Sequence, residues 1–385
     1  MIQASSPVAL VMHTQAEITM WMGALNACGL KKVTAFTSTT EAYEVCTRQQ
    51  FPLFVTRMEM PKMSGIILIQ KLRMTGNYGL EPQMFVCDKL DNKLLNVMAE
   101  YDIEYVSAAP FVGAALIEKL KHMIQMENNL SPGEVLYREA KTAFSSGIAE
   151  MAEESINEAL KVNPDLEKAL LLSGDIKAAK AEYQAASEVY KKVLVFNPKS
   201  AAAAHKLAQL YTAQGDHTAA ANLLSKLAEI SPYSIKLLEN AGLSNFAVER
   251  YDEAKRIMGK LSGLDETNKT AATVTAEIKI KDGDYDGLVE TLSKSHDEKS
   301  LIQFLNNAGA KLSKGDDLDG AIRMYSAAIE QITESKFLYA IHYNMGIAYK
   351  KKNDKPHAIV HFKKALKINP GFDKAAEELK KLQTI

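Results

Sequence analysis

The sequence predicts an α/β fold followed by an all-α fold: a doubly wound, five-stranded parallel sheet, then a solenoid of about seven helix pairs. Three features lead to this prediction. Apolar runs of strand length alternate with helical stretches between residues 8 and 126. Turn-forming residues interrupt the alternation at residues 128–133. Beyond them only the helical period remains, and prolines recur at a fixed interval.

The first part contains five apolar runs of strand length. Between them the apolar residues follow the helical period, as at Ile66, Ile69 and Leu72. Strands that alternate with helices favour a parallel sheet covered on both faces, and about 120 residues suit one such domain. The predicted strands are Val8–Met12, Val33–Phe36, Leu53–Val55, Met84–Cys87 and Tyr105–Val106.

The second part repeats with a period of 34 residues. The residues that recur at this interval are Pro164, Pro198 and Pro232, with Ala152, Ala186, Ala220 and Ala254. This period is typical of stacked helix–turn–helix units, each of which buries its apolar face only against a neighbour. The unit from Lys269 is degenerate, because Leu288 occupies the position of the small residue. The predicted units start near Gly133, Glu167, Ala201, Ile235, Lys269, Ile302 and Tyr339.

These patterns divide the chain into four parts. We expect an α/β domain at residues 1–127 and a linker at 128–132. The helical array then covers residues 133–372, and a final helix at 373–385 covers its end with Lys and Glu on the outer side.

The unit that starts at Tyr339 carries the fullest pattern of small and aromatic residues. Its pattern residues are Gly346, Tyr349, Ala358, Phe362, Ala365 and Pro370. In them the unit resembles the tetratricopeptide repeat (TPR) family, and the resemblance extends over about 250 residues. It implies a right-handed α-solenoid. Gly346 and Ala358 stand where the two helices approach closely, Tyr349 and Phe362 fill the space beside them, and Pro370 ends the second helix.

The TPR resemblance also implies a concave groove that receives peptides or helices. The first helix of each unit lines this groove, with the second, fifth, ninth, twelfth and thirteenth residues of the unit. No unit has Lys and Asn at the fifth and ninth positions, the pair with which some TPRs grip chaperone C-termini. The candidate protein-binding residues in the third and last units are His205, Gln209, Tyr343, Ile347, Lys350 and Lys351.

The segment FVTRMEMPKMSGIILIQKLR contains a second motif, Met60 to Gly65, between a predicted strand and a predicted helix. It resembles the centre of bacterial response-regulator receiver domains, where D-x-x-M-P-x-M-x-G joins a strand to a helix. Pro110-Phe111 after the fifth strand is similar as well. The resemblance covers residues 8–126. It implies that the bond between Ala109 and Pro110 is cis.

Receiver chemistry uses five side chains, and all five differ here. An aspartate accepts the phosphoryl group, two acidic residues help to hold Mg²⁺, and a hydroxyl and a lysine contact the phosphoryl oxygens. Arginine stays protonated in proteins and is no nucleophile. We therefore expect no phosphorylation, no bound metal and no cofactor. The residues of this degenerate pocket are Arg57, Met12, His13, Cys87 and Ala109, with Asp88 beside Cys87.

Two points about this pocket stay open. Asp88 balances the charge of Arg57 or, with Glu59, offers an alternative acceptor; we expect the balancing contact, with a bidentate geometry as one option. His13 is a metal ligand or an ordinary hydrogen-bonded side chain at a strand end, and the second is the commoner case.

The composition excludes several classes of protein. The formal net charge of −1 argues against a nucleic-acid-binding protein. Three dispersed cysteines fit a reducing compartment rather than a disulfide framework or a zinc site. The first residues lack a secretion signal, and no apolar run reaches about 20 residues, so we expect no membrane span and a cytoplasmic protein.

The predicted function is a non-enzymatic adaptor or scaffold. The pseudo-receiver docks one protein independently of phosphorylation and the TPR groove binds another, with bacterial motility or cell polarity as one setting. One alternative is a response regulator that is phosphorylated at an atypical site. Another is an assembly factor or cochaperone whose receiver-like domain mediates dimerisation; the oligomeric state stays open.

Overall fold

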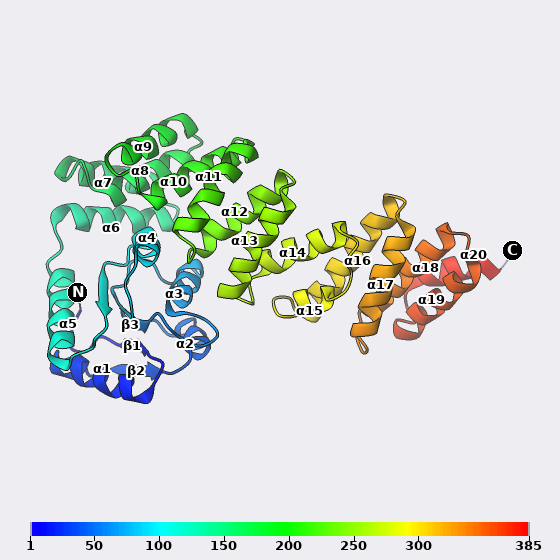
Figure 1. Ribbon diagram of the computed structural model, residues 1–385, viewed down its shortest axis with the longest axis horizontal. Helices are drawn as coiled ribbons and strands as arrows, with labels where there is room; N and C mark the ends of the chain where they lie inside the picture. The colour runs from blue at the N-terminus through cyan, green and yellow to red at the C-terminus, as the bar shows by residue number, and fades with distance from the viewer. Residues whose placement is uncertain (1, 384–385) are drawn as a thin grey trace. The chain divides into compact units, whose positions relative to one another are not determined.

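The computed structural model describes residues 2–383, which form two compact units that divide between Arg250 and Tyr251. The first unit contains an α/β region, residues 2–128, and the helices that follow it (Figure 1). The second contains helices alone. No helix in the described part of the chain is long and apolar enough to cross a membrane.

The α/β region is a parallel sheet of five strands, as predicted, and its strand order is β2-β1-β3-β4-β5. Its strands are β1 (Val8–Val11), β2 (Val33–Phe36), β3 (Leu53–Arg57), β4 (Gln83–Cys87) and β5 (Tyr105–Ala108). Its helices are α1 (Gln15–Ala27), α2 (Thr39–Cys46), α3 (Gly65–Met74), α4 (Asn92–Glu100) and α5 (Gly113–Asn128).

The three central strands are buried along their whole length, because helices cover both faces of the sheet. One face packs against α1 and α5 around Trp21 and Leu120, neither of which is exposed. Helices α2 and α3 contact each other on the opposite face. The carboxyl ends of β1, β3 and β4 therefore meet at one edge, where a doubly wound sheet places its functional residues.

Helix pairs follow the α/β region. In the first unit they are α6 (Pro132–Ser145) with α7 (Ala149–Val162), α8 (Glu167–Ala179) with α9 (Tyr183–Phe196), and α10 (Ala201–Ala213) with α11 (His217–Ile230), followed by α12 (Ile235–Ala247). The helices of the second unit are α13 (Tyr251–Leu264), α14 (Lys269–Lys281), α15 (Leu288–Ser293), α16 (Glu298–Lys314), α17 (Leu318–Gln331), α18 (Leu338–Lys351), α19 (Lys355–Ile368) and α20 (Asp373–Gln383).

The 34-residue repeat is visible in the backbone. Every 34 residues, in the turn that follows the first helix of a pair, a single residue adopts a left-handed conformation with φ between 61° and 81°. That conformation ends a helix and turns the chain back toward its partner. These residues are Gly147, Ala181, Gly215, Glu249 and Gly283. Ala181 and Glu249 show that the repeat imposes the turn even where glycine is absent.

The small residues of the repeats stand where two helices touch, as predicted. A Cβ atom on Gly346 would lie 2.7 Å from the ring of Phe362, which is fully buried. The same contact recurs at Gly174, where a Cβ atom would lie 2.3 Å from Tyr190. Because 2.3 Å is far inside van der Waals contact, glycine is required for these helices to approach so closely.

In the second unit, one prediction about the repeats is confirmed and another is wrong. The unit from Lys269 is degenerate as predicted, since α15 has only 6 residues. The start of the next unit near Ile302 is wrong: α16 begins at Glu298, because the side chain of Asp297 accepts a hydrogen bond from the backbone N–H of Ser300 and caps the helix earlier.

Candidate functional site

Arg57 ends β3 at the carboxyl edge of the sheet, next to the end of β4. The loop after it turns back sharply into α3. A Cβ atom on Gly65 would lie 1.9 Å from the carbonyl oxygen of Arg57, so only glycine allows α3 to start this close to the strand. The glycine of the Met60–Gly65 motif thus fixes the backbone around Arg57.

The guanidinium group of Arg57 is enclosed by three carboxylates. Nη2 donates to Asp88 at 2.7 Å, Nη1 lies 3.0 Å from Glu17, and Nη2 lies 3.6 Å from Glu59. The predicted contact with Asp88 is confirmed, but the bidentate option is wrong, because one nitrogen makes the hydrogen bond and Glu17 takes the other. The ring of Phe111 lies 5.6 Å from the guanidinium carbon.

The environment of Arg57 keeps its positive charge. The residue is 7% exposed, and burial by itself opposes the charge. The hydrogen bond to Asp88 and the charges of Glu17 and Glu59 outweigh burial, so the pKa of Arg57 lies above its ordinary value. A fixed cation therefore occupies the position that an acceptor carboxylate has in the receiver pattern.

The other predicted positions of this pocket are either buried or exposed. Met12 and Cys87 are fully buried, and burial raises the pKa of the Cys87 thiol to about 11. His13 and Ala109 are exposed, and the bond between Ala109 and Pro110 is cis as predicted. Within residues 2–383 no group of three or more His, Cys, Asp or Glu side chains could hold a metal ion.

A second arrangement joins the α/β region to the helix pairs of the first unit. Gln70 of α3 is completely buried and bonds to the backbone at the start of α12. Its Nε2 donates to the carbonyl of Tyr233 at 2.7 Å, and its Oε1 accepts from the N–H of Ile235 at 2.7 Å. Both ends of the amide are used, which explains why a polar residue sits in the otherwise buried run of α3.

Helix α4 lies against α10 and α11. Asn96 donates to the carbonyl of Ile230 at 2.9 Å, and Glu100 lies 2.8 Å from Nδ1 of His205. The amides of Asn240 and Gln209 approach the other ring nitrogen, Nε2, at 3.0 and 3.4 Å. With those donors on Nε2, the ring proton sits on Nδ1 and is donated to Glu100.

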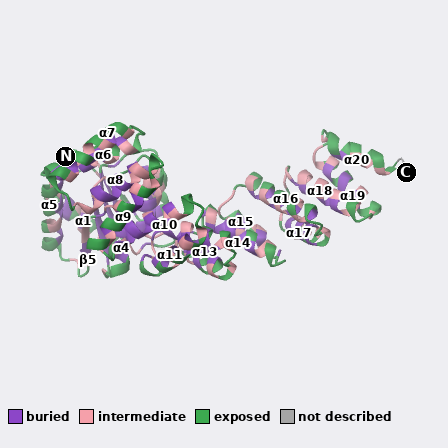
Figure 2. Cartoon of the chain, turned by 90° about the horizontal axis from the view of Figure 1, so that it is seen from above, coloured by how far each residue is buried: buried purple, intermediate pink, exposed green. Residues whose placement is uncertain are grey.

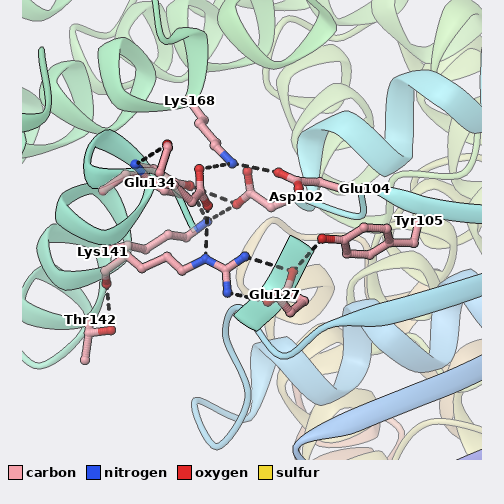
Figure 3. Close-up of polar contacts among 11 residues, drawn as sticks. Asp102, Glu104, Tyr105, Glu127, Glu134, Lys141, Thr142 and Lys168 are labelled. Carbon is pink, nitrogen blue, oxygen red and sulfur yellow. Dashed lines mark hydrogen bonds and ion pairs between the residues drawn. The ribbon is translucent and has the colours of Figure 1, made fainter. Parts of the chain in front are cut away.

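Acidic residues that follow α4 meet basic residues of the first two helix pairs (Figure 3). Asp102 accepts from the hydroxyl of Tyr137 at 3.0 Å and pairs with Lys141. Glu104 pairs with Lys168 at 2.6 Å. Burial would raise the pKa of Asp102, but Lys141 and other donors outweigh burial and lower it, so this carboxylate stays ionised.

The end of α5 is held in the same way. Glu127 accepts two hydrogen bonds from Arg138 of α6, at 2.7 and 3.1 Å, and one from Tyr105 at 2.9 Å. Both carboxylate oxygens of Glu127 therefore have partners (Figure 3). These partners offset the burial of the charge, since Glu127 is only 7% exposed.

A cavity of about 550 Å³ remains between α4 and the helix pairs. Its wall includes most of the second, fifth and ninth residues of the first three units, which were predicted to line the groove. These include Tyr137, Lys141, Lys168, Asp175, His205 and Gln209, whereas the predicted twelfth and thirteenth residues lie off this wall. Helix α10, which carries His205 and Gln209, is buried over most of its length (Figure 2).

The candidate groove residues of the last TPR-like pair lie elsewhere, in the second unit. Lys350 pairs with Glu378 of α20, and Lys351 donates to the carbonyl of Ser313 at 2.8 Å. Tyr343 stacks edge-on against Phe372, with ring centroids 5.1 Å apart, and Ile347 packs in the same cluster. Tyr343, Ile347 and Lys350 therefore face the end of the chain, whereas Lys351 faces α16.

Sequence reasoning missed Glu17, Gln70 and the contact of α4 with the predicted groove. Glu17 had a visible role, since Thr14 and Glu17 form the capping box at the start of α1. One of its carboxylate oxygens serves that cap and the other serves Arg57. Gln70 stood out only as a polar residue in an apolar run.

Two family models match parts of the chain. The model of the tetratricopeptide repeat matches residues 339–372. That of the anaphase-promoting complex, cyclosome, subunit 3 matches residues 179–261. The chain contains TPR repeats. The TPR match coincides with the unit in which the pattern of small and aromatic residues is fullest.

Solved structures resemble parts of the chain at low identity, and no curated protein matches it. A TPR protein from Parabacteroides merdae is 20% identical over 66% of this chain and 99% of its own, with a TM-score of 0.41. MamA from Desulfovibrio magneticus is 18% identical over 43% and 93%, with a TM-score of 0.38. The Vibrio cholerae chemotaxis protein CheY4 is 18% identical over 31% and 98%, with a TM-score of 0.29.

Proposed function

We propose that this chain is a non-enzymatic scaffold in which a pseudo-receiver, independent of phosphorylation, is combined with TPR helix pairs that bind another protein. The observation that carries the proposal is the buried Arg57 with Glu17, Glu59 and Asp88 around it. A fixed cation there replaces both the acceptor and the metal of a receiver. The pocket holds one conformation instead of switching between two.

The helix pairs support the binding half of the proposal. Stacked pairs of this kind present extended concave surfaces, and such surfaces are suited to peptides and helices. In this chain the TPR repeats supply that surface, and bacterial motility or polarity machinery is one setting in which a constitutive docking protein of this kind serves.

Incubation with acetyl phosphate and Mg²⁺, followed by intact mass, tests the pseudo-receiver half. We expect no gain in mass by one phosphoryl group, under conditions in which a receiver with its aspartate is modified. A stoichiometric gain that disappears in Asp88→Ala or Glu59→Ala would overturn the proposal. It would favour a response regulator with an atypical acceptor.

Cross-linking of the full-length chain to proteins of its source cell, followed by mass spectrometry, tests the binding half. We expect a specific protein cross-linked to first helices of the TPR pairs. An unrelated helical protein of equal charge is the control. Recovery of the same proteins with the control and the chain would contradict the proposal.

A further inference from the structure

The groove of the first three helix pairs already has an occupant, which is a segment of the same chain. Residues 96–104, comprising the end of α4 and the turn into β5, supply Glu100, Asp102 and Glu104 to it. Asn96 of the same segment donates to the carbonyl of Ile230 at the end of α11. We propose that this segment is an internal ligand, and that the groove takes an external protein segment of the same chemistry: a helix that ends in closely spaced carboxylates. This inference rests on the proposed function.

The charges on the two sides define that chemistry. The internal ligand carries three carboxylates within five residues, at positions 100, 102 and 104. Each meets a basic or proton-donating residue of a different helix pair: Glu100 meets His205, Asp102 meets Lys141, and Glu104 meets Lys168. Lys199 and Lys236, both exposed, lie at the same cavity and add positive charge. A basic or neutral helix would leave Lys141 without a carboxylate, whereas Lys168 would keep its contact with Glu134 at 2.6 Å.

The internal ligand fits the groove incompletely, which leaves room for a competitor. The cavity of about 550 Å³ stays open beside α4. One carboxylate oxygen of Glu100, Oε2, is buried and has no hydrogen-bond partner among residues 2–383. A buried acceptor without a donor is unfavourable, so an external segment that supplies every hydrogen bond of the groove should bind it better than α4 does.

Tethering explains how an imperfect ligand can hold the groove. The α/β region is joined to α6 by only three residues, 129–131. A short tether gives an effective concentration of about the millimolar range, which lowers the apparent affinity of any external ligand. Weakening the internal ligand should therefore raise external affinity without any change in the groove itself.

The test uses a labelled peptide of residues 91–105, which contains the internal ligand, added to the full-length chain. Glu100→Lys with Glu104→Lys weakens the internal contact by placing lysines against His205 and Lys168. Neither glutamate is fully buried, so the fold should survive. Glu44→Lys with Glu118→Lys makes the same change of charge at exposed positions of α2 and α5 and is the matched control.

We expect the peptide to bind the weakened chain at least about tenfold more tightly than the wild type or the control. A peptide with Gln at positions 100, 102 and 104 should lose that binding, and so should a weakened chain that also carries Lys141→Ala and Lys168→Ala. Hydrogen exchange at α4 should rise in the weakened chain alone.

Three results would overturn the inference. They are equal peptide affinity for wild type and weakened chain, no binding to either, and a wild-type dimer whose α4 cross-links to the groove of a second copy. If the inference fails while cross-linking still recovers a specific protein on the TPR pairs, the proposed function stands. If cross-linking recovers no protein but the peptide binds as expected, the proposed function is contradicted and the inference about the groove is supported.

Discussion

Arg57 is held at the edge of the sheet by carboxylates from three separate segments of the chain, at Glu17, Glu59 and Asp88. Its side chain is buried, whereas Asp88, its closest carboxylate, is 60% exposed in the side chain and Glu17 is 19% exposed. Exposed ion pairs contribute about 0–1 kcal/mol, but a buried cation that loses its place leaves carboxylates facing one another. The arginine therefore holds the strand-end loops together, and its loss should destabilise the α/β region.

The variant Arg57→Ala tests this at the residue scale. We expect a loss of roughly 1–3 kcal/mol in the free energy of unfolding of the α/β region, because Glu17, Glu59 and Asp88 lose their common partner. The measurement is urea unfolding followed by the fluorescence of Trp21, the single tryptophan. Arg57→Lys is the control. It keeps the positive charge but lacks the guanidinium group, so its free energy of unfolding should fall by less than that of Arg57→Ala. Equal stability in all three chains would show that the cluster is incidental.

A buried pair of histidines makes the last TPR pair sensitive to acid. Nδ1 of His342 in α18 lies 3.1 Å from Nδ1 of His361 in α19, and burial lowers the pKa of each to about 4. Lys364 and His357 add to the shift, and Tyr349 stacks on His361. Both rings are therefore neutral in the folded chain well below the unfolded pKa of 6.5.

The consequence for stability follows from the direction of these shifts. Below pH 6.5 the unfolded chain binds protons that the folded pair refuses, so stability is complete above pH 6.5 and falls as the pH drops toward 4. We expect a loss on the order of 1–3 kcal/mol across this window in thermal unfolding of the second unit. His361→Gln should make the stability of the second unit less dependent on pH, whereas His357→Gln, at an exposed position, should not. The same slope of stability against pH in all three chains would contradict the prediction.

Among the elements, α3 shows how a single side chain joins two parts of the first unit. Gln70→Ala removes the hydrogen bonds to Tyr233 and Ile235, so the carbonyl of Tyr233 and the N–H of Ile235 lose these partners. We expect a loss of about 2–4 kcal/mol, since each buried unpaired group costs about 1–3 kcal/mol. Hydrogen exchange of the Ile235 amide should accelerate. Gln50→Ala, at an exposed glutamine, is the control, and unchanged protection of Ile235 in Gln70→Ala would refute the prediction.

Element types were predictable from sequence, and their ends less so. Periodicity gave the five strands, and the 34-residue interval gave six of the seven starts to within one residue, from Gly133 near α6 to Tyr339 near α18. The exception, α16, starts early because Asp297 caps it. A cap depends on a single local hydrogen bond, which a repeat register cannot reveal.

At the scale of the whole chain, the Arg57–Asp88 contact was predictable but the occupied groove was not. Arg57 and Asp88 end neighbouring strands, so topology alone brings them together. Glu100 and His205 are 105 residues apart and belong to different kinds of structure. Their contact depends on how α4 packs against α10, which neither the α/β pattern nor the repeat pattern encodes.

In the proposed pseudo-receiver, a fixed arginine stands in place of metal and phosphoryl chemistry at the edge of the sheet. Calorimetric titration of the full-length chain with Mg²⁺ and beryllofluoride tests it most directly. We predict no saturable heat up to millimolar Mg²⁺, because Arg57 is a permanent cation where the metal would lie and Met12 supplies no oxygen ligand. Saturable binding at millimolar or lower Mg²⁺ that is lost in Asp88→Ala would contradict the claim.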